Sequence, residues 1–327
     1  MHVLANITLK PTDSFVTLSL IPYLTNFTLL FMMVSAFSMC CGYYERVKSG
    51  AISPCDFYRK RYARVWPFFA VMVVLSVAVD RDLRSVQEAV LDLTLCFNLL
   101  PNADIRTIGV GWFLGTIFAF YILFPFFTYL IDSRRKAWGV LAASLFVVYI
   151  AVNPLFEMGG IDRKNIVYSS PFFIVGGLVY LYREPLARWI DSHMMLATLL
   201  TVVLSVMVFM AVPVGAPLPI LRELLFFTLL IIYALGARNA VLHNRVTSYL
   251  SKISMEVYLC HMMCFRVVAM LHIDRHIFDP DLLYVITVAL TLVSAIGFSH
   301  VVKFHVLPRL SNACVAVGHR CGMINGC

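Results

Sequence analysis

Charged side chains are scarce in this sequence. Only 13% of its 327 residues are Asp, Glu, Lys or Arg, and 61% are hydrophobic, whereas soluble domains average about a quarter charged and about half apolar. This composition excludes a soluble globular protein of this length. Because apolar runs recur throughout and no polar block interrupts them, we expect one all-α domain over residues 1–327, a polytopic bundle of transmembrane helices.

Evidence for a metal site or a nucleic-acid surface is also lacking. The formal charge of +8 is ordinary for a membrane protein whose cytoplasmic loops carry Lys and Arg, so we expect no nucleic-acid partner. The nine cysteines lie mostly in or beside apolar runs, where a thiol packs as a small apolar group. The tail residues Cys314, His319, Cys321 and Cys327 match no closed zinc pattern. We therefore expect no metal.

The start of the chain has neither a signal peptide nor a complete span. Residues 1–18 are mixed and polar, which fits neither element. About nine later runs approach the roughly 20 apolar residues that a span requires. They cover residues 18–44, 65–79, 110–131, 137–154, 171–182, 196–212, 218–235, 251–271 and 282–302. The apolar run 89–100 is too short to cross a membrane, so we expect a re-entrant or interfacial helix there.

The loops predict an orientation. Basic loops alternate with weakly charged or acidic ones, the basic ones being residues 45–64, 132–136, 183–188 and 238–252. Because Lys and Arg concentrate in cytoplasmic loops, we expect these loops in the cytoplasm and the N-terminus outside. Within the first span, Ser35 and Ala36 are small enough to let another helix approach closely.

The most basic stretch directly precedes an apolar run. It contains Arg59, Lys60, Arg61 and Arg64. Arg61 and Arg64 are three residues apart, so on a helix they share a face and suit a phosphate or carboxylate that accepts paired hydrogen bonds. Pro67 follows, and we expect it in the first turns of the apolar helix, where its missing N–H costs least. The alternative is a basic anchor that only marks the cytoplasmic end of a span.

Two ionisable residues lie inside a later span. Glu256 and His261 are costly in an apolar helix unless they face the bundle interior or water, so both are functional candidates. A helix–helix hydrogen bond is the alternative role. Trp112, at the outer end of its span, is either an interfacial anchor or a site residue. His2 is the only histidine before His193, although a residue at a chain end is ordinarily frayed and exposed.

Five segments occur in an order that one membrane family shows. They are residues 31–37 (FMMVSAF), 59–67 (RKRYARVWP), 112–125 (WFLGTIFAFYILFP), 171–177 (PFFIVGG) and 253–261 (ISMEVYLCH). These segments are similar to the family patterns Phe-Phe-x-x-Ser-Gly-Phe, Arg-x-x-Arg-hydrophobic-x-Pro, Trp-x-Leu with Phe-Tyr-x-x-x-Pro, Phe-Phe-x-x-Gly, and Ser-x-Glu-x-Tyr-Leu-x-His. The chain thereby resembles, over nearly its whole length, the acyltransferase 3 family of integral membrane acyltransferases, which modify extracytoplasmic glycans and other acceptors.

Two departures from the family pattern stand out. The family's first helix carries an Arg followed by a His taken to be catalytic, and here only His2 corresponds to that His. One more helix upstream would give about ten spans, the number expected for the full family fold. Ala36 also replaces the usual Gly. We expect either a shortened start, which we favour, or a degraded family member.

The resemblance implies transfer of an acyl group, in the first place acetyl, from acyl-CoA to a hydroxyl of a cell-surface or lipid-linked carbohydrate. It implies a multi-pass protein of the bacterial inner membrane, in contact with membrane lipids. The implied site residues form three groups: His2, Glu256 and His261 as catalytic residues; Arg59, Arg61 and Arg64 for acetyl-CoA; and Trp112, Tyr121 and Tyr258 for the acceptor.

Two other functions stay open at this point. A transporter or flippase could use the same charges for gating, and an internally repeated hydropathy pattern would favour it, although the sequence shows no such repeat. A non-catalytic relic of the acyltransferase fold is the third possibility. Covalent transfer of a label from acetyl-CoA to a glycan separates an enzyme from both.

Overall fold

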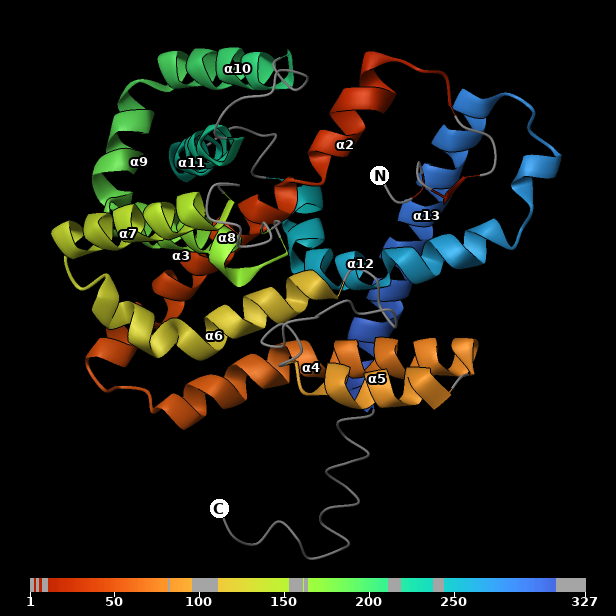
Figure 1. Ribbon diagram of the computed structural model, residues 1–327, viewed down its shortest axis with the longest axis horizontal. Coiled ribbons are helices and arrows are strands. Elements are labelled where there is room, and N and C mark those ends of the chain that lie inside the picture. Colours follow the sequence, from red (N-terminus) through yellow and green to blue (C-terminus); the bar gives the residue numbers. More distant parts are fainter. Residues whose placement is uncertain are drawn as a thin grey trace, which may run out of the picture.

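Helices are the only regular secondary structure in the described part of the computed structural model. This part comprises residues 3, 6, 7, 11–81, 83–95, 111–152, 161, 164–210, 219–237 and 244–309. Over these residues the chain forms helices and no strand, so the expected all-α bundle is confirmed there. Figure 1 shows long helices packed side by side, with α6 and α4 crossing the molecule beside the ends of α12 and α13.

The described residues form fifteen helical elements. In chain order they are a π-helical turn η1 (Val16–Leu20), α2 (Ile21–Leu24), α3 (Phe27–Lys48), α4 (Pro54–Asp80), α5 (Leu83–Leu93), α6 (Trp112–Leu130), α7 (Arg134–Val152), α8 (Ile166–Leu181), α9 (Arg183–Ser192), α10 (Met194–Met210), α11 (Pro219–Gly236), α12 (Arg245–Ala269), a 3₁₀ turn η4 (Ile273–Arg275), α13 (Pro280–Val301) and a second π-helical turn η5 (Val302–Val306).

Several helices are long and apolar enough to cross a membrane. Among the described residues they are Val16–Lys48, Pro54–Asp80, Trp112–Leu130, Arg134–Val152 and Pro280–Arg309. The pair α8 and α9, bent by 73°, adds up to one more. The chain is therefore a multi-pass membrane protein, while the number of about nine spans stays a prediction.

Helix α5 is shorter than a span. Its 11 residues rise about 16 Å, roughly half of a hydrocarbon core of about 30 Å. It packs along α4 (Figure 1), and the indole N–H of Trp66 donates to the carbonyl of Leu93 at 3.0 Å. This length agrees with a helix that does not cross, although residues 96–100 of the predicted segment lie outside the described residues.

Helix α4 begins well before the apolar run that predicts it. Pro54 occupies its first turn, and Ser53 caps it by accepting a hydrogen bond from the Asp56 N–H at 3.1 Å. The expectation that Pro67 lies in the first turns is therefore wrong, because Pro67 lies inside the helix. A proline there has no N–H for the carbonyl of Ala63, four residues earlier.

The tightest helix packing joins α3 to α8. A Cβ at Gly176 would lie 2.3 Å from the carbonyl oxygen of Met33 and 2.8 Å from the Cβ of Ala36. Gly177 lies close to α6, since its Cβ would lie 2.7 Å from the ring of Phe127. Small residues on both helices thus allow the close approach that the sequence predicts around Ala36.

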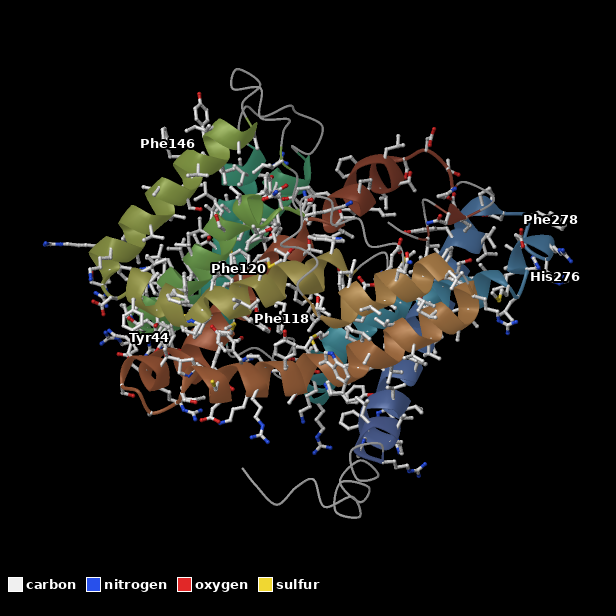
Figure 2. All side chains as sticks on the ribbon, turned by 60° about the horizontal axis from the view of Figure 1, so that its bottom comes forward. Tyr44, Phe118, Phe120, Phe146, His276 and Phe278 are labelled. Atoms are coloured by element: carbon white, nitrogen blue, oxygen red, sulfur yellow. The ribbon has the colours of Figure 1, made fainter. Side chains whose placement is uncertain are left out.

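Helix α6 forms the centre of the bundle. Most of its residues are buried, and it contacts α3, α4, α7 and α8. The rings of Phe120 and Phe173 stack with centroids 4.3 Å apart, and Figure 2 shows Phe118 and Phe120 well inside the outline of the bundle. Such aromatic pairs are worth about 0.5–1.5 kcal/mol beyond the burial of their surface, so α6 is a rigid reference for the side chains around it.

Candidate functional site

The first group of predicted site residues lies on α4. The hydroxyl of Tyr58 donates to the carbonyl of Ile122 at 2.7 Å, and the ring of Tyr62 meets that of Phe118 edge-to-face at 4.4 Å. These contacts fix the basic half of α4 on α6. Figure 2 shows nitrogen-bearing side chains along the lower edge of the bundle, below α4. Arg59 is among the exposed residues of this helix.

Arg61 is buried in a cage of aromatic rings. Only 7% of it is exposed, and its guanidinium carbon lies 4.3 Å from the ring centroid of Tyr43, 5.5 Å from Tyr121 and 5.9 Å from Phe57. Its Nε has no hydrogen-bond partner among the described residues. A guanidinium stacks on such rings by cation–π attraction. Arg61 and Tyr121, predicted for donor and acceptor respectively, are therefore neighbours.

Arg64 faces a different space. It lines a cavity of about 860 Å³ between α4, α12 and η5, together with Trp66, Pro67, Glu256 and Lys303. A volume of this size falls in the range of about 300–1,000 Å³ that is typical of ligand sites. The sequence predicts that Arg61 and Arg64 act from one helix face, but the structure gives their guanidiniums different neighbours. Of the two, only Arg64 lines the cavity.

An ion pair between a buried carboxylate and a partly exposed lysine also lines this cavity. Glu256 is 4% exposed, and its Oε1 lies 2.6 Å from Lys303 Nζ. Its Oε2 has no hydrogen-bond partner among the described residues. Lys303 also donates to the carbonyl of Lys252. The sequence analysis does not single out Lys303 as a site residue. It could have done so, because Lys303 is a cation directly after the last apolar run and a Glu inside an apolar helix, such as Glu256, needs a counter-ion.

The remaining described candidates gather where α12 meets α6. The ring of Tyr258 meets Phe113 edge-to-face at 5.0 Å, and Trp112 lies against Phe113 with ring centroids 5.9 Å apart. His261 Nδ1 lies 2.6 Å from the Tyr258 carbonyl. In a neutral imidazole this contact places the proton on Nδ1 and leaves Nε2 as an acceptor. Trp112 and Tyr258 thus both contact Phe113, and His261 contacts Tyr258; their roles toward an acceptor stay predictions.

Two predictions cannot be placed in this way. His2 lies outside the described residues, as do the tail residues Cys314, His319, Cys321 and Cys327. Among the residues that are described, no three His, Cys, Asp or Glu side chains approach closely enough to hold a metal ion. The catalytic role of His2 and the expected absence of a metal therefore stay predictions.

Comparisons with known proteins agree with the family resemblance. A family model described as an acyltransferase domain matches residues 1–300, more than nine-tenths of the chain. Searches of curated proteins and of solved structures each find no match. With its apolar helices and a match of this extent, the chain belongs to the acyltransferase 3 family of membrane acyltransferases.

Proposed function

We propose that this protein transfers an acyl group, in the first place acetyl, from acyl-CoA to a hydroxyl of a cell-surface or lipid-linked carbohydrate. The observation that carries the proposal is the cavity of about 860 Å³ in which Arg64 faces the buried Glu256–Lys303 pair. It opens beside the most basic segment of the chain, on the predicted cytoplasmic side. The protein would act in the bacterial inner membrane, surrounded by its lipids.

The donor end of the site is cationic and apolar at once. Arg64 supplies a fork of N–H donors that suits a phosphate, and the exposed Arg59 and Lys60 stand one turn nearer the start of α4. Trp66, Phe68 and Val71 supply apolar walls. This combination fits acyl-CoA, which carries phosphates at one end and a thioester on a flexible arm at the other.

Arg61 has a related but separate role in this proposal. Its ring contacts hold α3, α4 and α6 together, and its Nε keeps a donor to offer. In this proposal Arg61 positions α4, the helix that carries Arg64. Its Nε–H would donate a hydrogen bond to the arm of acyl-CoA that carries the thioester. A lysine in its place would keep the charge but lose the planar stacking.

The acceptor end needs a base. Either His2 or His261 would take the proton of the acceptor hydroxyl, since a neutral imidazole suits this transfer near pH 7. The hydroxyl oxygen would attack the thioester carbonyl carbon, the carbon–sulfur bond would break, and the CoA sulfur would leave with the proton. Trp112 and Tyr258 would stack on the sugar, and this chemistry requires no metal.

The test is label transfer in membranes that contain this chain. Acetyl-CoA labelled in the acetyl group is supplied, and label bound covalently to glycan is counted. We expect transfer by the parent, and a loss of tenfold or more in Arg64→Ala, about the 1.4 kcal/mol or more that a charge-assisted hydrogen bond contributes. Arg135→Ala, which removes an exposed cation from the start of α7, is the matched control and should keep full activity.

Two variants identify the base. Loss of transfer in His2→Ala but not in His261→Gln would assign the proton transfer to His2, and the reverse result would assign it to His261. A chain that moves substrate across the membrane without covalent labelling would be a transporter or flippase. Neither movement nor labelling, in a protein that is folded and inserted, would identify a non-catalytic relic.

A further inference from the structure

A second cavity lies apart from the one that Arg64 lines. It has a volume of about 550 Å³ and runs between α7, α8 and α11, which pack with α8 in the middle (Figure 1). Aliphatic side chains line most of it, among them Leu141, Val175, Leu178 and Leu224. The hydroxyl of Thr228 donates to the carbonyl of Leu224 at 2.5 Å, so that hydroxyl is occupied within its own helix. This apolar trough suits a hydrocarbon chain and offers little to water.

One end of the trough is different, because a cation and two aromatic side chains meet there. The indole N–H of Trp138 donates to the Tyr182 hydroxyl at 3.3 Å. The guanidinium of Arg134 lies 4.5 Å from the centroid of the same Tyr182 ring and donates to the carbonyl of Leu181 at 3.4 Å. Trp138 and Tyr182 both line the trough. Tyr182 also marks the junction of α8 and α9, where the chain bends by 73°.

This end has the character of a membrane interface on the cytoplasmic side. Trp, Tyr and Arg concentrate at the level of lipid headgroups, where an apolar ring and a polar tip are both solvated. Arg134 and Arg135 begin α7 and are exposed. The carboxylate of Asp132 is engaged by Lys48 and Lys136, at 2.5 and 3.2 Å. The cationic charge of Arg134 is therefore available to an anion.

We infer that this trough binds an anionic phospholipid of the cytoplasmic leaflet. One acyl chain lies between α7, α8 and α11, and the phosphate accepts hydrogen bonds from the Arg134 guanidinium. The trough should prefer anionic to zwitterionic phospholipids, because the cationic Arg134 attracts the anionic headgroups in which the cytoplasmic leaflet is rich. The lipid would contact Tyr182 and so brace the bend between α8 and α9.

The experiment uses the full chain in nanodiscs with a photoactivatable phosphatidylglycerol that carries its reactive group in the acyl chain. Cross-linked peptides are identified by mass spectrometry, with competition from unlabelled phosphatidylglycerol or phosphatidylcholine. We expect labels on α7, α8 and α11 that phosphatidylglycerol displaces about fivefold better than phosphatidylcholine. Arg134→Gln should abolish that preference while labelling of the trough continues, and Arg135→Gln should leave it unchanged.

A further variant, further competitors and cross-links between copies distinguish a phospholipid from other occupants of the trough. Leu145→Trp places a large ring in the half-buried wall of the trough and should reduce labelling of α8 and α11, with folding checked by gel filtration. Equal displacement by both phospholipids in the parent would overturn the inference. Stronger displacement by a polyprenyl phosphate would replace the phospholipid with a lipid-linked carrier. Cross-links between two copies of the chain across the trough would replace it with a dimer interface.

Discussion

Removing one member of the Glu256–Lys303 pair should destabilise the bundle more than removing both. The Glu256 side chain is 6% exposed and that of Lys303 is 29% exposed. Breaking a buried pair leaves an uncompensated charge and costs about 3–5 kcal/mol, and we expect the lower end because Lys303 retains some access to water. Glu256→Gln and Lys303→Met should therefore each lower the unfolding temperature by several degrees.

The double variant tests the reasoning directly. Glu256→Gln combined with Lys303→Met removes both charges, so it should recover most of the loss and show a coupling of about 2 kcal/mol. Thermal unfolding in detergent, followed by tryptophan fluorescence, compares the four proteins. Glu184→Gln is the control, because its partner is Arg183 and the Glu184 side chain is 77% exposed; it should not shift the midpoint. Losses that simply add in the double variant would refute a coupled pair.

Three further outcomes can be measured on the same protein. Gly176→Ala should lower the free energy of unfolding by about 1–3 kcal/mol, because its Cβ would lie 2.3 Å from a backbone oxygen of α3. Gly42→Ala is the control: a Cβ at Gly42 would have no atom within 4 Å, so this variant should be neutral or slightly stabilising in an unfolding assay. Arg61→Lys should lower the unfolding temperature by the equivalent of about 1–2 kcal/mol through lost stacking, while Arg64→Lys should leave that temperature unchanged and weaken binding of acyl-CoA. Hydrogen bonds from Lys48 and Lys136 hold the pKa of Asp132 below its ordinary value of 3.8. This carboxylate therefore stabilises the fold above that value and loses the effect as pH falls through its lowered pKa. Asp132→Asn should make the unfolding temperature less sensitive to pH below about 4, and an unchanged profile would contradict the assignment.

The sequence predicts the helices better than it predicts where they begin. Apolar runs identify α6 and α13 closely, because a run that must exclude water is visible in composition alone. They fail for the start of α4, because charged residues can continue a helix beyond the apolar run. The true start is marked by local sequence: Ser53 followed by Pro54 is an ordinary N-cap and first residue of a helix. Because the apolar run begins near Val65, it places Pro67 in the first turns of the helix, whereas the helix begins at Pro54.

The candidate site was predictable as a set of residues but not as an arrangement. Residues three apart on a helix differ by about 60° in direction, and spacing alone treats Arg61 and Arg64 as one face. Where α4 packs against α5, α6 and α12, that angle is enough to turn Arg61 toward Tyr43 and Tyr121 and to leave Arg64 on the wall of the cavity that Glu256 also lines. Which neighbour each one meets depends on tertiary packing, which a single sequence does not display.

Helix geometry also constrains how the two ends of the proposed reaction can meet. Glu256 and His261 are five residues apart on α12, so they differ by about 140° in direction and about 7.5 Å in height, and they cannot act on the same atom. Helix α6 joins the two regions: Phe113 touches Tyr258 at 5.0 Å, and Tyr121 faces Arg61 at 5.5 Å, about 12 Å further along the helix. Under the proposed mechanism, the arm of acyl-CoA would have to cover this distance along α6 to bring its thioester to the base. On this proposal the aromatic cage of Arg61 would lie at the donor end of that path, so substitutions there should impair transfer even where the cavity around Arg64 is intact.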